Sequence, residues 1–290
     1  MLLFEAGEPM LDYDFFIQLG LKKPTEIIPM DTGSCSVNYY VKNEDGEFLV
    51  KLKKPSKRVK FLSDNLKDIS GKPFCPTLLF EKESFYGYHV FVLNWIQGKS
   101  YFLEKLSHKT LKQIIKAHLS FLTLINKNKD RGLVPQETPI KMYQKIQKPY
   151  VFMKAELDAI KQDLSYQPTL QIIHGDFHFK NIVIKNGELQ SFIDFENFRL
   201  GLPTVDLIRL LLTNAEQHHL LRTRYTIKLL KFFIQESPFS KQEWLYGLDS
   251  FVLEKYEKKL RKRNIKQWIQ LYYCNLLYHR LRKTINQSFG

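Results

Sequence analysis

The sequence contains few cysteines and no long apolar run, and each absence excludes a class of protein. Its 290 residues include three cysteines, Cys35, Cys75 and Cys274, which lie far apart and form no C-x-x-C pair. This spacing indicates neither a disulfide framework nor a zinc site, and it fits a reducing compartment, so we expect a cytoplasmic protein. A membrane span is not expected, because no apolar run reaches the roughly 18 residues that a spanning helix needs. We also expect no signal peptide, because the first apolar residues follow no basic region.

Acidic residues are outnumbered by basic ones. The chain carries 44 Lys and Arg against 30 Asp and Glu, so its formal net charge is +14. Part of the excess lies in residues 255–266, KYEKKLRKRNIK, a run that could contact nucleic acid, anionic lipid or a phosphorylated ligand. A solvated helix face is the simpler interpretation. No zinc-finger or RNA-binding motif accompanies the run, so we expect no nucleic-acid partner.

Three short apolar runs lie within one stretch of the chain: residues 170–173, 182–184 and 191–193. The first run leads into His174-Gly175-Asp176, Asn181 follows five residues after Asp176, and the third run ends at Asp194. An Asn-Gly turn at residues 186–187 separates the second and third runs, which predicts a strand pair. Such a pair would place Asp176, Asn181 and Asp194 close together at one end.

These three side chains are suited to phosphoryl transfer. Two carboxylates and one amide supply hard oxygen ligands, which suit a magnesium ion that keeps some of its water. Phosphoryl transfer needs one acid that accepts the proton of the attacking hydroxyl and oxygens that hold the metal on the phosphates. An Asp followed five residues later by an Asn is the spacing of the kinase catalytic loop, H-R-D-x-x-x-x-N. The alternative, that these residues only cap turns, would explain one of them better than all three at this spacing.

Further motifs in the same stretch resemble a known family of small-molecule kinases. Ile193-Asp194-Phe195-Glu196 and Gly201-Leu202-Pro203-Thr204-Val205-Asp206-Leu207 follow the first motif. Together they resemble the aminoglycoside phosphotransferase and choline kinase-like family. The resemblance implies an α+β, two-lobed protein-kinase-like fold. The smaller lobe would be an antiparallel-sheet, nucleotide-binding lobe over residues 1–94, and the larger, mainly helical lobe would span residues 95–290. ATP and magnesium would bind in the cleft between the lobes, and Asp206 would bond the backbone of the catalytic loop.

The resemblance also assigns nucleotide-binding residues before the catalytic loop. Gly33, Ser34 and Ser36 precede a predicted hairpin over residues 37–53, and they would bring backbone N–H groups and hydroxyls near the phosphates. Ordinary turns of this composition are common, so the loop alone is weak evidence.

A lysine and a hinge would complete the nucleotide site. Phe48-Leu49-Val50-Lys51 is similar to the kinase V-A-I-K signature, so Lys51 would pair with the α- and β-phosphates. Lys53 is its rival, because alternate residues of a strand share a face. Asn94 and Ile96 lie where the resemblance places the hinge, and they would contact adenine mainly through their backbone.

One expected residue is missing from the helix that follows. Apolar residues recur at helical spacing and predict a helix: Val59, Leu62, Leu66 and Ile69. The family usually carries a glutamate early in this helix as the partner of the lysine, yet residues 57–63 contain no acid. Asp64 and Asp68 are the nearest substitutes. The departure favours, as an alternative, a pseudokinase-type module that binds nucleotide without turnover.

The preferred hypothesis is an ATP-dependent phosphotransferase that moves the γ-phosphate to a hydroxyl of a small molecule. Asp176 would orient the hydroxyl and accept its proton, while Asn181 and Asp194 would hold Mg²⁺. The acceptor would be a sugar, an amino alcohol or an aminoglycoside-like compound, and the positive net charge weakly favours a sugar or an anionic acceptor. A protein substrate is disfavoured, because only a short stretch separates Asp194 from Asp206 and leaves little room for an activation loop. The oligomeric state stays open.

Overall fold

The computed structural model describes residues 2–3, 9–10, 12–30, 36–126, 139–146, 149–163, 165–217, 223–260 and 265–290. The chain divides into two compact units. One comprises Met1–Gly98 and Gln190–Glu196, and the other comprises Lys99–Leu189 and Asn197–Gly290. The expected domain boundary after residue 94 stays a prediction. Within the described residues, no helix has the length and apolar character needed to cross a membrane.

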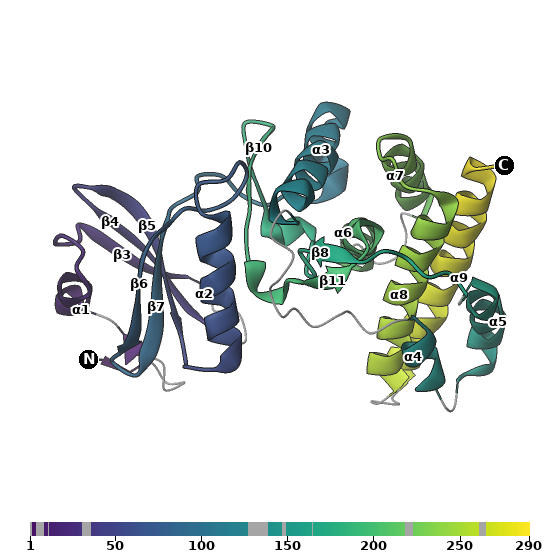
Figure 1. Cartoon of the computed structure of the whole chain (residues 1–290), viewed down its shortest axis with the longest axis horizontal. Coiled ribbons are helices and arrows are strands. Elements are labelled where there is room, and N and C mark those ends of the chain that lie inside the picture. Colours follow the sequence, from purple (N-terminus) through teal and green to yellow (C-terminus); the bar gives the residue numbers. More distant parts are fainter. Residues whose placement is uncertain are drawn as a thin grey trace. The chain divides into compact units, whose positions relative to one another are not determined.

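The first unit is built on a five-stranded antiparallel sheet with strand order β3-β4-β5-β7-β6 (Figure 1). Its strands are β3 (Glu26–Met30), β4 (Val37–Asn43), β5 (Gly46–Lys53), β6 (Leu78–Phe85) and β7 (Tyr88–Asn94). A separate pair, β1 (Leu2–Leu3) and β2 (Pro9–Met10), precedes it. The predicted hairpin over residues 37–53 is confirmed as β4 and β5.

The two faces of this sheet have different roles. On one face Phe48, Val50 and Leu52 are buried with helix α1 (Tyr13–Leu19), whose first turn is capped by Asp12. The opposite face carries Leu49, Lys51 and Lys53, because side chains alternate along a strand. The two lysines that the sequence analysis considered for phosphate binding therefore lie on this second face.

Helix α2 (Lys57–Ile69) covers part of the second face. Its predicted apolar stripe is confirmed, since Val59, Leu62, Leu66 and Ile69 are all buried. The Ser63 hydroxyl of α2 donates to the Glu81 carboxylate at 2.7 Å. Glu81 pairs across the sheet with Phe91, which in turn pairs with Lys51, so α2 lies on the face of that lysine.

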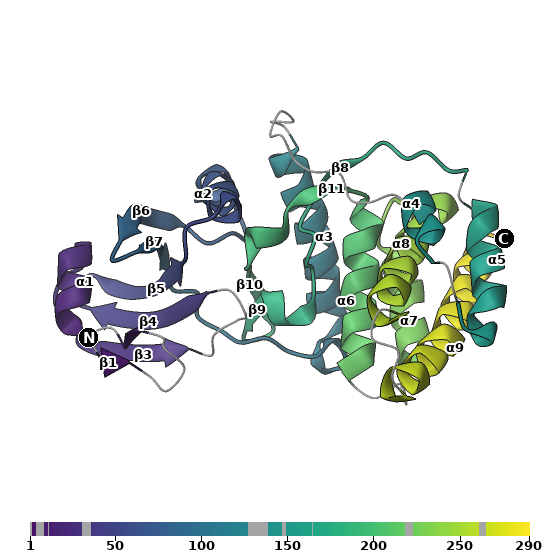
Figure 2. The same cartoon turned by 90° about the horizontal axis from the view of Figure 1, so that it is seen from below.

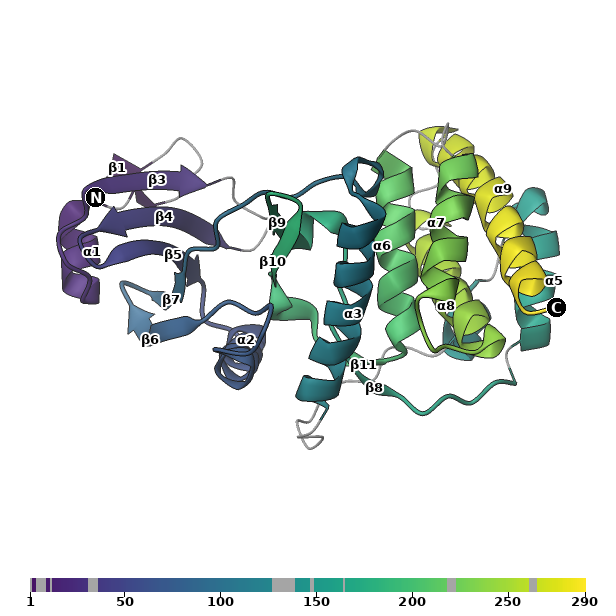
Figure 3. The same ribbon diagram turned by 90° about the horizontal axis from the view of Figure 1, so that it is seen from above.

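The second unit is mainly helical (Figure 2). Its larger helices are α3 (His108–Ile125), α6 (Pro203–Gln217), α7 (Thr223–Gln235), α8 (Lys241–Leu260) and α9 (Ile265–Ser288). Shorter helical elements are η1 (Leu103–Lys105), α4 (Pro139–Gln144), η2 (Val151–Met153), α5 (Lys154–Asp163) and η3 (Phe179–Asn181). Helices α6, α7, α8 and α9 pack side by side (Figure 3). Gly247 of α8 permits the close approach of α6, because an added Cβ would lie 2.9 Å from the Thr204 backbone.

Short strands carry the predicted catalytic stretch. Strand β8 (Gln171–Ile173) pairs with β11 (Arg199–Gly201), and β9 (Ile182–Lys185) pairs with β10 (Glu188–Phe192). The strand pair predicted around the Asn-Gly turn is therefore confirmed. A last short helix, η4 (Phe195–Asn197), follows β10.

The basic run of the sequence falls at the junction of α8 and α9. Its residues 261–264 lie outside the described residues. Lys258, at the end of α8, is exposed and pairs at 2.6 Å with the mostly buried Glu254 one turn earlier. The same carboxylate also pairs with Arg209 at 2.7 Å. The interpretation of the whole run as a solvated face stays a prediction.

Candidate active site

The catalytic loop is anchored by one buried carboxylate in the second unit. Asp206, in the first turn of α6, accepts the His174 backbone N–H at 2.9 Å and the Gly175 N–H at 3.0 Å. The imidazole of His118, on α3, approaches the same carboxylate at 3.1 Å. Burial alone would raise the pKa of Asp206, but the bond from His118 holds that pKa below its ordinary value. The predicted bond from Asp206 to the loop backbone is confirmed.

Gly175 is required by the shape of this loop. Its φ of +78° lies in the left-handed region, which a residue with a Cβ rarely adopts. An added Cβ would overlap the backbone carbonyl oxygen of Asn197 and lie 3.3 Å from the side chain of Arg199. The glycine therefore lets the catalytic loop pass directly against the segment that follows η4.

Asp176 is held in its ionised form. Its carboxylate is partly exposed, and His178 Nε2 lies 3.7 Å from it. Burial would raise the pKa of Asp176, but the nearby imidazole of His178, together with Arg209 and His174, holds it below its ordinary value. At neutral pH the group is therefore a hydrogen-bond acceptor with low basicity.

Asn181 is tied to the same loop. It is buried in η3, and its side-chain Nδ2 donates to the Asp176 carbonyl oxygen at 2.9 Å. The bond engages the nitrogen end of the amide, so the oxygen is the atom that could serve a metal. The structure thus brings Asp176 and Asn181 together within the second unit.

Lys51 and Asp194 meet in the first unit. Lys51 Nζ lies 3.2 Å from Asp194 Oδ1 and also contacts the Glu196 carboxylate. Lys53, the predicted rival, binds the second oxygen of Glu196. Burial would lower the pKa of Lys51, but Asp194 and Glu196 raise it above its ordinary value, so the ammonium stays charged. The predicted convergence of Asp194 with Asp176 and Asn181 stays a prediction.

Asp194 also has an unusual backbone. Its φ of +65° lies in the left-handed region, which few residues other than glycine occupy. Residues held in such conformations cluster at functional sites. The strained backbone is therefore a second sign, independent of the ion pair, that this carboxylate has a specific task.

Asp64, one of the α2 acids considered from the sequence, is not the partner of Lys51 in the structure, and the role of Asp68 stays a prediction. Asp64 is exposed, and the ion pairs of Lys51 are with Asp194 and Glu196. The α2 residue near Asp194 and Glu196 is the buried Asn65. Its Nδ2 donates a hydrogen bond to the Phe195 carbonyl oxygen at 3.4 Å. Sequence reasoning missed Asn65, and its only signal was a polar residue beside an apolar helical stripe.

The remaining predicted nucleotide residues are partly described. Gly33 and Ser34 lie outside the described residues, while Ser36 accepts a hydrogen bond from Asn38 at 3.4 Å. Asn94 uses its side-chain oxygen to accept the Thr77 N–H at 2.5 Å, which is a structural role at the end of β7. Ile96 is half-buried in the irregular segment that follows β7.

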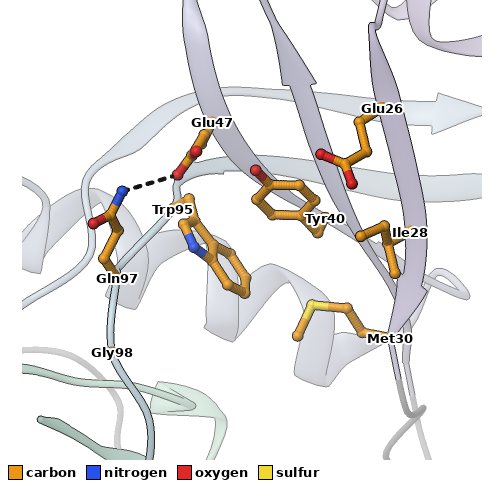
Figure 4. A pocket seen from close by; sticks show the side chains of 8 residues that line it. All are labelled: Glu26, Ile28, Met30, Tyr40, Glu47, Trp95, Gln97 and Gly98. Carbon is orange, nitrogen blue, oxygen red and sulfur yellow. Dashed lines mark hydrogen bonds between the residues drawn. The ribbon is translucent and has the colours of Figure 1, made fainter. Parts of the chain in front are cut away.

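A pocket lies on the Lys51 face of the sheet, next to the irregular segment that follows β7 (Figure 4). Its volume is about 480 Å³, and its lining residues are Glu26, Ile28, Met30, Tyr40, Glu47, Trp95, Gln97 and Gly98. Tyr40 and Trp95 meet edge to face with ring centroids 4.9 Å apart. Tyr40 pairs across the sheet with Leu49, so the pocket continues the face of Lys51 along the strands. The sequence alone did not predict the pocket, because it depends on strand register.

Comparison with known proteins identifies the family. Residues 27–230 match the family described as the phosphotransferase enzyme family. The chain belongs to this family. No curated protein matches the sequence.

Solved structures of this family share the fold over nearly the whole chain. A thermostable mutant of aminoglycoside phosphotransferase APH(4)-Ia, in complex with AMP-PNP and hygromycin B, is 13% identical with a TM-score of 0.63, and the match covers 94% of this chain and 98% of that one. APH(2")-IIa with streptomycin and ATP is 17% identical with a TM-score of 0.57, covering 92% and 99%. ADP-bound APH(2'')-Ib is 18% identical with a TM-score of 0.53, covering 96% and 99%. The predicted two-lobed α+β fold of the phosphotransferase family is confirmed.

Proposed function

We propose that this ATP-dependent phosphotransferase, which acts on a hydroxyl group of a small molecule, positions the nucleotide through Lys51 and Asp194 and the acceptor through Asp176. The contact of Lys51 with Asp194, at 3.2 Å, is the observation that carries the proposal. Phosphoryl transfer needs a cation on the α- and β-phosphates and a carboxylate that holds the metal. A buried lysine and a backbone-strained carboxylate that are already in contact supply both.

The order of residues along β5 suggests how the nucleotide would be oriented on the sheet. Lys51 would neutralise the phosphates, and Leu49, the next residue on that face, would lie over the base. Tyr40 and Trp95 come next on the same face, where their rings offer edges and faces to a purine. The backbone of Asn94 and Ile96 would bond the edge of the base, and Gly33, Ser34 and Ser36 would contact the phosphates.

Magnesium fits the available donors. Within the described residues, no group of three His, Cys, Asp or Glu side chains forms a metal cage. Mg²⁺ does not require one, since it usually keeps several waters and binds one or two carboxylates together with substrate phosphates. Asp194 and the amide oxygen of Asn181 would be its protein ligands. The ion would supply charge neutralisation on the transferred phosphoryl group.

Asp176 would act mainly by orientation. Its pKa is lowered, so it is a weak base. It would therefore accept a hydrogen bond from the acceptor hydroxyl rather than remove the hydroxyl proton before phosphoryl transfer. A weak base is sufficient, because most analyses give phosphoryl transfer a loose transition state, for which catalysis is mainly positioning and electrostatic stabilisation.

The acceptor is a small polyol or amino alcohol under this proposal. The solved relatives hold hygromycin B or streptomycin beside a nucleotide, which supports a sugar-like acceptor. The net charge of +14 favours neutral or anionic sugars over polycationic compounds. A screen of hydroxyl compounds for ADP release with Mg-ATP identifies the acceptor.

The decisive variant is Asp176→Asn. It should keep its fold and its stabilisation by Mg-ATP, while the rate of phosphotransfer falls by roughly 10²–10⁴-fold. Asp158→Asn, an exposed change in the same unit, is the matched control and should behave as wild type. Turnover of Asp176→Asn near the wild-type rate would reject the assignment. Stabilisation of the wild type by Mg-ATP without turnover on any acceptor would instead favour a pseudokinase.

A further inference from the structure

We propose that Glu196 is the positioning residue for Lys51, in the role that a helix acid would otherwise have. The inference rests on the proposed function, because it concerns how the phosphate-binding lysine is held. It begins from the contacts of a single carboxylate. Glu196 places one oxygen on Lys51 and the other on Lys53, so it bridges two lysines that lie two residues apart on β5.

Burial makes this bridge specific. The Lys51 side chain is 12% exposed and that of Lys53 is 8% exposed. A buried ammonium needs a paired anion, because the cost of removing it from water is otherwise uncompensated. The carboxylate of Glu196 supplies that anion to both lysines at once.

Helix α2 supports this cluster through the backbone rather than through a carboxylate on Lys51. Its exposed Asp64 contacts no lysine of this cluster, and the buried residue next to it is the neutral Asn65. Asn65 donates to the Phe195 carbonyl between Asp194 and Glu196. The helix therefore holds the backbone of the acidic segment, and that segment holds the lysine.

The balance of charge explains why both acids are needed. Two lysines and two carboxylates form a neutral cluster around β5. Under the proposed function Asp194 would hold the metal, and Lys51 would then depend on Glu196 for its orientation. Without Glu196, both lysines compete for the carboxylate that the metal requires.

The test is a double-mutant cycle on phosphotransfer kinetics. Glu196→Gln should lower kcat/KM for ATP by roughly 10²-fold, the size expected when a positioning contact is lost. Lys51→Met should cost at least as much. If Glu196 acts through Lys51, the variant carrying both changes should be no more than about threefold slower than Lys51→Met alone. A purely structural residue or a metal ligand would instead give losses that multiply.

Two further variants keep the cycle decisive. Glu196→Asp retains the charge and should show an intermediate loss, and it replaces Glu196→Gln in the cycle if the latter does not fold by circular dichroism. Asp64→Asn is the control on α2 and should stay within about threefold of wild type. The inference is rejected if Glu196→Gln keeps near-wild-type kcat/KM, if the losses multiply, or if Asp64→Asn causes the loss. If Lys51→Met also keeps full activity, the proposed function itself fails.

Discussion

The carboxylate of Asp206 offers the sharpest test of how the catalytic loop is held. Its two oxygens serve the N–H groups of His174 and Gly175 and the imidazole of His118. Asparagine has the same shape but only one acceptor oxygen. In Asp206→Asn, the amide NH₂ must therefore face at least one buried donor, and the anionic charge is lost.

The expected cost follows from these contacts. A hydrogen bond to a charged group contributes about 1.5–3 kcal/mol, and a buried donor left without a partner costs about 1–3 kcal/mol. We therefore expect Asp206→Asn to lower the free energy of unfolding by roughly 4 kcal/mol, a large part of a typical total of about 5–15 kcal/mol. The corresponding fall in Tm is about 10 °C.

Denaturant unfolding measures this loss against the exposed control Asp158→Asn. The pKa of Asp206 is lower in the folded state than its ordinary value of 3.8, so the unfolded state binds more protons in acid. The stabilisation is thus complete above the ordinary carboxyl pKa, and it is lost as pH falls through the lower, folded pKa. The difference between wild type and Asp206→Asn should accordingly be full at pH 7 and shrink below about pH 4. A difference under about 1 kcal/mol at pH 7 would refute the anchoring role.

Two other predictions concern the neighbouring loops. Gly175→Ala should destabilise the protein by at least about 2 kcal/mol and reduce kcat, because its Cβ would overlap the Asn197 carbonyl; wild-type stability and activity would show that the loop has another conformation. Asp194→Ala should abolish the magnesium-dependent part of the thermal shift with ATP, because its carboxylate is the proposed ligand that would hold the metal. Equal magnesium-dependent shifts in this variant and wild type would assign the ion to another residue.

Local spacing predicted much of the frame of the site. The Asn-Gly turn predicted the pairing of β9 and β10, and the apolar stripe predicted α2, because both depend on residues close in sequence. Ser240 and Glu243 are also close in sequence, and their reciprocal hydrogen bonds form a capping box at the start of α8. Such features need no knowledge of the rest of the fold.

The pocket beside Tyr40 and Trp95 could not be predicted in this way. Tyr40 and Trp95 are separated by more than 50 residues, and they meet only because β4 pairs with β5 and β5 with β7. A one-residue change of register would move Tyr40 to the opposite face. Alternation within one strand identified the face of Lys51 but not the residues that other strands add to it.

Sequence spacing could not identify the carboxylate that pairs with Lys51. An acid was expected on the helix after the lysine, and its absence raised doubt about turnover. Glu196 lies more than 140 residues away, yet it forms the contact. Charge neutrality around a buried ammonium constrains which charges surround it, but it does not constrain which element carries them. A missing acid at one position is therefore poor evidence for lost activity until the other carboxylates that can reach the same lysine are known.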